Sequence, residues 1–514
     1  MKESDIRAEK FLSVSSQYKL GNLVTESPHP HTRDLSYLAV NRLPEAIQKL
    51  KDLDVNVLDI LRQKLPEIVY LKNIINETFD AGHNVYFCGC GATGRLSLTI
   101  ETIWRQMKDG KPEANRVFSF MSGGDVALIR SIENFEDFPT YGARQLIEAG
   151  FTDGDLLIST TEGGETPFVI GATEEAARIS KRKPFFLYCN PDDILCEVAE
   201  RSKRVILNNN IEKINLTVGP MAITGSTRMQ SSTILLAVAG IPLFFCDSSN
   251  DEIRNEISSF VEYWITSDIS FLEGFTSTES DYYKKGEYLL YETDRQLGIT
   301  VITDTTERSP TFSLFPFENV VENETNLSLC YLFMPESKTS KDAWESLLWR
   351  APRTLEWPDI NGIASQRRLL GFDFSNNVRS RRESLKTQHV FKILNNDKGI
   401  SFELGKEYHL LKIPFATPIF RHLILKMIMN THSTLIMGRL GRYEGNVMTY
   451  LRASNNKLID RSIRYIDMIL KEKNISLSYD ESCYVLFEML EKISTDQAIV
   501  VATVDEIVRR NKPR

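Results

Sequence analysis

The stretch NVYFCGCGATGRL, residues 84–96, decides how this chain folds. Its first half is a short apolar run of β-forming residues, and its second half is a glycine-rich loop that opens a helical stretch. The same alternation continues along the chain, with strands expected at 84–89, 116–121, 155–160 and 184–189 and helices at 94–107, 124–150 and 166–181. Strands that alternate with helices of this length predict a parallel sheet covered by helices on both faces. Such a sheet binds its ligands in the loops at the carboxyl ends of its strands.

A second run of strands and helices follows, after helices expected at 227–246 and 250–268. We expect its strands at 298–303, 327–333, 389–394 and 408–413, and its helices at 341–349, 417–440, 455–473 and 480–510. The similar size and order of the two units suggest a degenerate internal duplication. The predicted fold class is therefore α/β, with two tandem flavodoxin-like parallel-sheet units and helical segments at both ends of the chain.

The expected domains follow from this order of elements. They are an N-terminal arm with helices, two sheet domains and a short C-terminal helical segment, at 1–60, 61–270, 280–475 and 476–514 respectively. Residues 1–35 are polar and predict an irregular arm. The apolar spacing over 36–82 predicts two helices, broken either near Pro66 or in the Asp52–Asp54 region.

Composition excludes several classes of function. The 514 residues carry a net charge of -8, which argues against binding along a nucleic-acid backbone but leaves room for one basic pocket. No apolar run reaches the roughly 18 residues of a membrane-spanning helix, and MKESDIRAEK at the start lacks the apolar core of a signal peptide. We therefore expect a cytoplasmic protein with no membrane and no nucleic-acid partner. Seven sparse cysteines, without an HExxH or CxxC motif, favour reduced thiols and predict neither a metal nor any other cofactor.

Three loops rich in glycine and hydroxyl residues stand at expected helix starts: GCGATG (89–94), STTEGGETP (159–167) and GPMAITGSTR (219–228). Each alone has an ordinary explanation, either a tight turn or an N-capped helix start. A dinucleotide site requires an acidic residue about 20 positions after the glycine loop, and Asp125 lies more than that distance beyond it. Together the three loops predict one convergent polar site. No Walker lysine follows any of them, so a phosphorylated sugar fits better than a nucleoside triphosphate.

These loops resemble those of the sugar isomerase (SIS) family, and within it the group of the N-acetylmuramic acid 6-phosphate etherases and the glucokinase regulatory protein. GCGATGRL (89–96) is similar to the family's glycine and hydroxyl loop. TVGPMAITGSTRM (217–229) is close to the family signature, and EGGETPF (162–168) matches the sugar-phosphate loop in part. The tandem arrangement resembles the regulatory protein more than the single-unit, homodimeric etherases.

Two further motifs bring glutamates into the resemblance. SGGDVALIRSIENFED (122–137) is similar to the segment that carries a functional glutamate, here Glu136. DTTERSPTF (304–312) resembles an etherase motif whose glutamate is catalytic, here Glu307. A match to the family's closing helices runs from Lys426 to ASNNKL at 453–458.

Several positions depart from the etherase pattern. Ile103 stands where the etherases carry a glutamate, and GEYLLYETDRQLG (286–298) has no glycine loop. Each unit therefore lacks what the other retains, which implies one composite site built from first-unit loops and from second-unit side chains. Ala92 replaces a hydroxyl residue, and Glu165 replaces an arginine, which reverses the charge beside the sugar.

The resemblance assigns roles to individual residues. It implies Glu136 as the base and Glu307 as the acid, with ligand contacts from Gly91, Thr93, Gly94, Thr161, Gly163, Ser226, Thr227 and Lys426. The residues by themselves leave other interpretations open. Glu307 would also suit a surface position at a helix start, Glu136 a solvated face, and Lys426 a side chain that extends from an apolar helix towards solvent.

Two main functions follow from the resemblance. One is a carbon–oxygen lyase that acts on a sugar 6-phosphate in amino-sugar catabolism. The other is a non-catalytic sugar-phosphate sensor that controls a sugar kinase, although the C-terminal helices at 480–510 are much shorter than the regulator's lid. An aldose–ketose isomerase is the third and weakest option. The tandem arrangement implies either a monomer with an internal pseudo-dimer or a homodimer.

Overall fold

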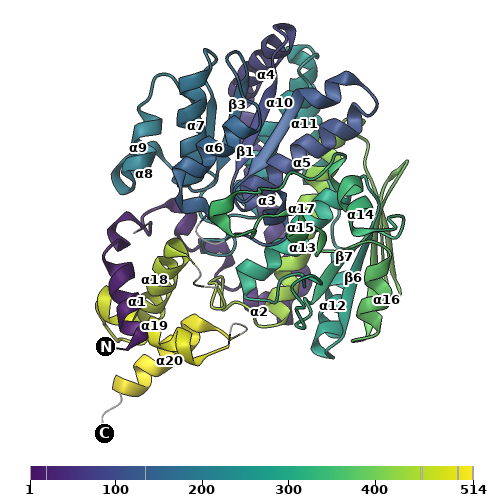
Figure 1. The fold of residues 1–514 in the computed structure, drawn as a ribbon. Helices are drawn as coiled ribbons and strands as arrows, with labels where there is room; N and C mark the ends of the chain where they lie inside the picture. The colour runs from purple at the N-terminus through teal and green to yellow at the C-terminus, as the bar shows by residue number, and fades with distance from the viewer. Residues whose placement is uncertain are drawn as a thin grey trace.

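A five-stranded parallel sheet forms one side of the molecule in the computed structural model (Figure 1). The structure describes residues 2–18, 20–132, 135–451, 453, 455–494 and 497–511. The strand order is β2-β1-β3-β4-β5, with strands at Val85–Gly89 (β1), Val117–Met121 (β2), Leu156–Thr161 (β3), Phe185–Tyr188 (β4) and Glu212–Asn215 (β5). The first four are the predicted strands. The fifth, EKIN, is short and polar and was not predicted.

Alternate residues of each strand face opposite sides of this sheet, and each side has its own apolar cluster. Val85 and Phe87 of β1 lie in the cluster that holds α4 (Leu65–Asp80), α5 (Ala92–Met107) and α10 (Gln230–Phe244). Tyr86 and Cys88 lie in the cluster that holds α6 (Pro139–Glu148) and α7 (Pro167–Ile179). The predicted α/β class, with helices on both faces of a parallel sheet, is confirmed.

The stretch 124–150 contains less α-helix than its pattern predicts. Gly123 and Gly124 have φ angles of 91° and 66° and turn the chain after β2. Two 3-10 turns follow at Asp125–Leu128 and Phe135–Asp137, and α6 begins only at Pro139. The prediction of one long helix over 124–150 is therefore wrong. Pro139 lacks the N–H that an interior helix position donates, so it suits the first turn of α6 and not the middle of a longer helix.

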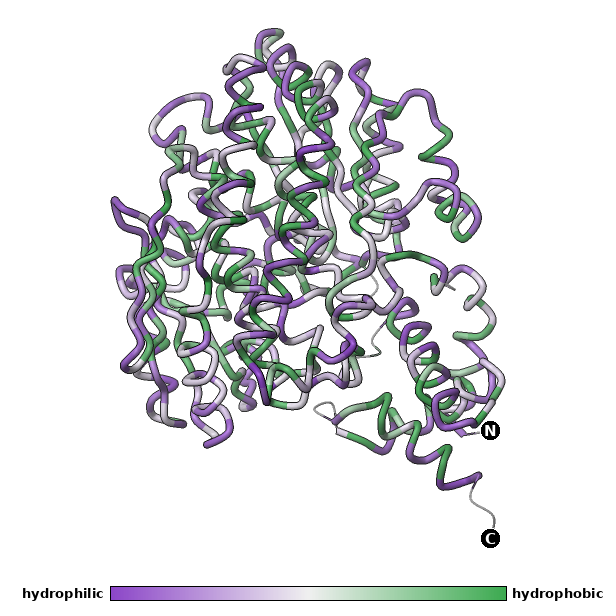
Figure 2. Tube along the Cα trace, turned by 180° about the vertical axis from the view of Figure 1, so that it is seen from behind, coloured by the Kyte–Doolittle hydropathy of each residue, from purple (hydrophilic) through white to green (hydrophobic). Residues whose placement is uncertain are grey.

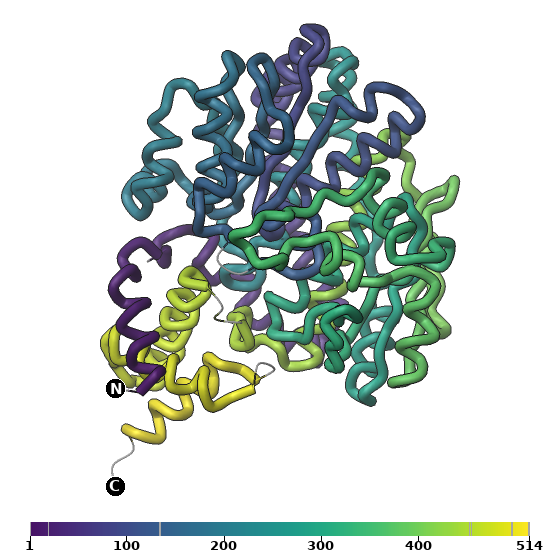
Figure 3. Tube along the Cα trace, viewed as in Figure 1, coloured from purple at the N-terminus to yellow at the C-terminus, as the bar shows by residue number. Residues whose placement is uncertain are grey.

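The region 36–82 forms three helices where two were predicted, because α2 (Leu35–Asn41) and α3 (Leu43–Gln63) both precede α4 and the first sheet. Helix α3 runs through Asp52 and Asp54 without a break, and α4 carries Pro66 in its first turn, so the break point near Pro66 is confirmed. The first 35 residues are not wholly irregular, since α1 (Glu3–Leu12) forms there. It packs against α19 (Tyr479–Lys492) from the opposite end of the chain, as the purple and yellow segments of Figure 3 show.

The second sheet has five strands in the order β10-β9-β8-β6-β7. Its members are β6 (Tyr288–Thr293), β7 (Cys330–Phe333), β8 (Gln388–Asn396), β9 (Gly399–Leu404) and β10 (Glu407–Lys412). Strand β6 pairs parallel with β7 and β8, whereas β9 pairs antiparallel with β8 and β10. This sheet is therefore mixed, unlike the first. Each sheet falls within one of the two predicted sheet domains, whose boundaries stay predictions.

The strand expected at 298–303 is wrong, because these residues open helix α13 (Gly298–Phe312). Its β-branched run favours a strand locally, but Ile299, Val301 and Ile302 are all fully buried, so burial around the whole helix overrides that preference. The Asp294 carboxylate accepts hydrogen bonds from the main-chain N–H groups of Gln296 and Leu297, both at 2.9 Å, and fixes the turn into α13. The strand of this region is β6, just upstream.

Helix α17 (Pro418–Arg439) runs through the middle of the molecule and contacts α10, α12 (Leu272–Lys284) and α13. One apolar cluster is continuous across α10, α13, α17 and one face of each sheet, so the two units share a core. The helices predicted at 480–510 are α19 and α20 (Ile499–Asn511), which pack with α18 (Asn456–Glu472). Figure 2 shows hydrophobic and hydrophilic segments alternating along these outer helices, as expected when one face is exposed. Within the described residues, no helix combines the length and apolarity that a bilayer crossing demands.

Candidate ligand-binding site

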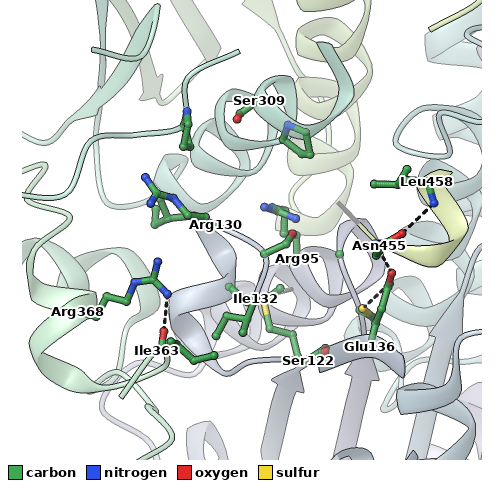
Figure 4. Close-up of a pocket in the computed structure, with 18 residues that line it drawn as sticks. Arg95, Ser122, Arg130, Ile132, Glu136, Ser309, Ile363, Arg368, Asn455 and Leu458 are labelled. Atoms are coloured by element: carbon green, nitrogen blue, oxygen red, sulfur yellow. Dashed lines mark hydrogen bonds between the residues drawn. The ribbon is translucent and has the colours of Figure 1, made fainter. Parts of the chain in front are cut away.

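Two adjoining hollows lie where the carboxyl ends of the first sheet's strands meet α13 and α18, and Figure 4 shows residues that line the larger one. The larger has a volume of about 470 Å³ and the smaller about 180 Å³. Five residues line both of them and make them one cleft: Gly91, Arg95, Ser131, Pro310 and Leu458. First-unit and second-unit segments thus border the same space.

The glycine loop after β1 presents its backbone to this cleft. Gly91 lines both hollows with a φ of 56°, which favours glycine. The Thr93 hydroxyl accepts from the Cys90 N–H and donates to the Cys90 carbonyl, both at 2.9 Å, so it closes the loop upon itself. Gly94 packs against Met121, where a Cβ atom would come within 2.6 Å of the Met121 Cβ. Of the three predicted contacts in this loop, only Gly91 borders the cleft.

The loop after β3 is braced internally. The Thr161 and Thr166 hydroxyls lie 3.0 Å apart, and Thr161 Oγ1 also accepts from the Gly164 N–H at 3.3 Å. The Gly163 carbonyl accepts from the Asn190 amide at 3.1 Å. Neither Thr161 nor Gly163 lines the cleft, and ligand contact by either stays a prediction.

The charge reversal at Glu165 is compensated within the protein. Its carboxylate pairs with Arg201 at 2.7 Å and with Lys457 of α18 at 2.6 Å. Despite its burial, these two cations hold the pKa of Glu165 down at about 2. Glu165 therefore ties the β3 loop to α18 and does not line the cleft.

Ser226 and Thr227 line the smaller hollow, in the loop that precedes α10. The Thr224 N–H donates to the Asn446 carbonyl at 2.8 Å, and the Tyr465 hydroxyl donates to the Thr224 carbonyl at 2.6 Å. These contacts from the second half of the chain hold the loop against the cleft. The predicted contact residues of this loop are thus placed beside Gly91, and their role stays a prediction.

Glu136 borders the larger hollow from the 3-10 turn at Phe135–Asp137. The Asn455 amide at the start of α18 donates to its Oε1 at 2.7 Å, and Cys90 Sγ donates to its Oε2 at 3.5 Å (Figure 4). The carboxylate is thus fixed at the cleft by first-unit and second-unit groups, and it does not belong to a freely solvated face.

Glu307 borders the smaller hollow from well inside α13, with 5% of its surface exposed. A surface acid at a helix start is therefore the wrong interpretation. Burial raises the pKa of Glu307, while the positive charges of Arg95, Arg228 and Lys426 oppose that rise. No ion pair within 4.0 Å joins Glu307 to another described residue.

Lys426 lies behind the cleft and not in it. Its ammonium donates to the Arg228 carbonyl at 3.1 Å, Thr233 Oγ1 at 2.9 Å and Asn430 Oδ1 at 2.8 Å. Burial lowers its pKa to about 8, so a side chain extended to solvent is the wrong interpretation. The second unit uses Lys426 to hold the end of the 219–228 loop.

Sequence reasoning missed four residues that border the cleft or its loops: Arg95, Glu162, Arg368 and Asn455. Arg95 and Glu162 lie inside the quoted motifs and could have been weighed as charged groups near the loops. Burial raises the pKa of Glu162 to about 7, and its Oε1 has no hydrogen-bond partner among the described residues. Arg368 reaches the cleft through long-range packing, for which the sequence carries no signal, whereas Asn455 lies inside the quoted ASNNKL motif and could have been weighed there. No three His, Cys, Asp or Glu side chains in the described part of the chain cluster as a metal site would require.

Residues 67–176 match the family model described as the glucokinase regulatory protein N-terminal SIS domain. The resemblance to the SIS group is confirmed. The SIS match includes the glycine loop, Glu136 and the β3 loop, and it ends before Ser226 and the second sheet.

Curated relatives of the chain are named N-acetylmuramic acid 6-phosphate etherase. The protein of Mesorhizobium japonicum is 32% identical over 215 residues, which are 42% of this chain and 64% of that relative. The protein of Vibrio campbellii is 30% identical over 214 residues, with the same two coverages. The chain thus spans slightly less than two thirds of the length of these relatives. Among solved structures, tagatose-6-phosphate ketose/aldose isomerase from Escherichia coli covers 77% of this chain and 95% of its own at 14% identity, with a TM-score of 0.43, too low to carry an argument.

Proposed function

We propose that this protein is a carbon–oxygen lyase that cleaves an ether of a sugar 6-phosphate, as the names of its etherase relatives suggest. The observation that carries the proposal is that two carboxyl groups, Glu136 and Glu307, border one cleft with Arg95 common to both hollows. The SIS match supports a sugar-phosphate ligand. The backbone at Gly91 and the hydroxyls of Ser226 and Thr227 are available to its phosphate.

The two glutamates suit opposite proton-transfer roles. In the open-chain sugar the aldehyde at C1 acidifies the proton at C2, and Glu136, held as a hydrogen-bond acceptor by Asn455, removes it. The electron pair forms a C2–C3 double bond as the C3–O bond breaks. Glu307, whose pKa is raised by burial, gives its proton to the departing ether oxygen. Water then adds its hydroxyl to C3 and a proton returns to C2, so both carboxyl groups recover their starting states.

A sugar-phosphate sensor is the second candidate, and two observations favour it. The matching family model carries the description of a regulatory protein, and Ile103 stands where the etherase pattern has a glutamate. A binding-only protein would use Glu136 and Glu307 to accept hydrogen bonds from sugar hydroxyls. A sugar kinase as partner, and either an internal pseudo-dimer or a homodimer as assembly, belong to this proposal as well.

Kinetics in deuterated water separates these functions. The full chain is incubated with N-acetylmuramic acid 6-phosphate, and proton NMR follows the C2 proton and the methyl group of released lactate. We expect loss of the C2 signal and growth of free lactate. Binding by calorimetry without exchange or lactate over hours would contradict the lyase and leave the sensor. Formation of a ketose without lactate would instead identify an isomerase.

A further inference from the structure

Arg95 differs from every other deeply buried arginine in the described part of the chain. Five such arginines have a carboxylate oxygen within 3.2 Å: Arg105, Arg228, Arg308, Arg382 and Arg461. Arg95 is only 2% exposed, yet no carboxylate of a described residue lies within 4.0 Å of its guanidinium. A buried cation without a partner is unfavourable by several kcal/mol, so its retention indicates that something else neutralises it.

The free end of this side chain faces the cleft. Arg95 Nε donates to the Leu128 carbonyl at 3.2 Å and to Thr306 Oγ1 at 3.3 Å, which fixes the plane of the guanidinium. The terminal nitrogens Nη1 and Nη2 make no hydrogen bond to any described residue. Arg95 lines both hollows, and Figure 4 shows its guanidinium between Arg130 and Asn455.

The groups around Arg95 add positive charge and so further favour a bound anion. Arg95 lies in the first turn of α5, whose N-terminal N–H groups at the glycine loop carry partial positive charge. The strongest compensating charge comes from Glu307, whose own pKa is raised, so a proton on Glu307 leaves the guanidinium still less neutralised. Arg130 borders the same cleft but already has an anionic partner. Both of its terminal nitrogens donate hydrogen bonds to the Glu324 carboxylate at 2.7 Å.

We infer that Arg95 binds the carboxylate of the ether-linked acid on the ligand, through both terminal nitrogens. This inference rests on the proposed function and adds a second anionic group to the ligand. Two N–H groups in one plane match the two oxygens of a carboxylate. In a lactyl ether the carboxylate carbon is bonded to the carbon that bears the ether oxygen. A carboxylate bound to Arg95 therefore places the ether oxygen near Glu307. The phosphate then binds to Ser226, Thr227 and the backbone at Gly91.

Calorimetry with two ligands tests the assignment. One ligand is N-acetylmuramic acid 6-phosphate and the other is the same sugar 6-phosphate with a free hydroxyl at C3. All proteins carry Glu136→Gln, so that no turnover disturbs the measurement. We expect Arg95→Gln to weaken binding of the ether ligand by about 10- to 100-fold and that of the hydroxyl ligand by far less. Arg130→Gln, the matched control, should leave the preference for the ether ligand intact.

Each other outcome overturns the inference. Equal losses for both ligands would mean that Arg95 holds the phosphate, and no loss for either would remove Arg95 from the binding site. Arg95→Lys, which keeps the charge but not the planar fork, provides the measurement if Arg95→Gln does not fold, and we expect it to lose most of the preference. Failure of the proposed lyase activity is distinguishable, since binding with this preference but without lactate release would leave the inference standing in a sensor.

Discussion

The Lys426 ammonium, on a helix of the second unit, donates a hydrogen bond of 3.1 Å to the carbonyl of Arg228, at the end of a first-unit loop. This contact crosses nearly 200 residues of sequence and lies next to Ser226 and Thr227. Lys426 does not line the cleft. Direct ligand contact by Lys426 stays a prediction, and we expect it to act as a positioning residue whose effect on a ligand passes through the 219–228 loop.

Lys426→Met should therefore weaken sugar-phosphate binding by about 10-fold, because the carbonyls of Arg228 and Met229 lose a charged donor. Hydrogen exchange of the amides at 225–229 should rise in the ligand-free variant, which a direct ligand contact would not cause. Lys72→Met is the matched control, since Lys72 also donates from a buried site, to Asn250, far from the cleft. Unchanged exchange together with reduced affinity would contradict the positioning role.

Glu307→Gln should lower turnover by about 100-fold or more while ligand binding survives, because glutamine keeps the shape but cannot donate the proton. The raised pKa of Glu307 also sets a pH dependence for the wild type. An acid is active in its protonated form, so kcat/KM should fall on the alkaline side as Glu307 ionises. Stopped-flow or coupled assay of lactate release across pH checks both statements. A variant with wild-type turnover would exclude Glu307 as the acid.

Glu162→Gln should stabilise the protein at neutral pH. Burial raises the pKa of Glu162 from 4.5 to about 7, so between these values the unfolded chain has lost a proton that the folded chain keeps. Wild-type stability therefore falls as pH rises through this window, and the amide variant avoids that loss. The difference in unfolding free energy should grow from pH 4.5 to 7 and reach up to about 3 kcal/mol above it.

Urea unfolding at several pH values measures that difference. Glu174→Gln serves as control, because Glu174 pairs with Arg204 on an exposed surface and should change stability by less than about 0.5 kcal/mol. A pH-independent difference for Glu162→Gln would show that its carboxyl group ionises normally in the folded protein.

The first sheet could be predicted because its strands are apolar on both faces, as in the buried runs at 84–89 and 155–160. That sheet's geometry also brought the glycine loop and the 219–228 loop to the same cleft. The second unit was harder. Its β-branched run at 298–303 lies in a helix that is buried all round, so local preference gave the wrong element.

The sequence does not predict the environment of the charged residues in the site. Arg95 and Glu162 are visible in the quoted motifs, but what distinguishes them is the partner that each lacks, which only packing determines. Ligand contact by Thr93 and Thr161 stays a prediction, and the structure shows both hydroxyls engaged in hydrogen bonds within their own loops. Hydroxyl content alone cannot separate a brace from a ligand contact.

The segment 350–365 of the second unit crosses onto the first unit, where two carboxylates, Glu101 and Asp125, bind its arginines. Glu101 of α5 lies 2.8 Å from Arg353 and 3.2 Å from Arg350, and is 1% exposed. Leu355 and Trp357 then pack into the apolar cluster beside α6 and α7. These arginines hold the pKa of Glu101 well below its usual range.

Glu101→Gln should lower the free energy of unfolding by about 3–5 kcal/mol, because the buried Arg105 and the partly buried Arg353 lose their carboxylate partner, whereas Arg350 keeps Asp125. It should also weaken ligand binding to a smaller degree, since Ile363 within this segment and Arg368 just after it border the larger hollow. Urea unfolding measures the loss of stability and calorimetry the loss of ligand affinity, while trypsin cleavage within 350–365 reports release of the segment. Glu345→Gln is the control, as Glu345 is 42% exposed and only 3.8 Å from Lys341. If the two variants unfold at the same urea concentration, the Glu101 cluster does not fasten the segment to the first unit.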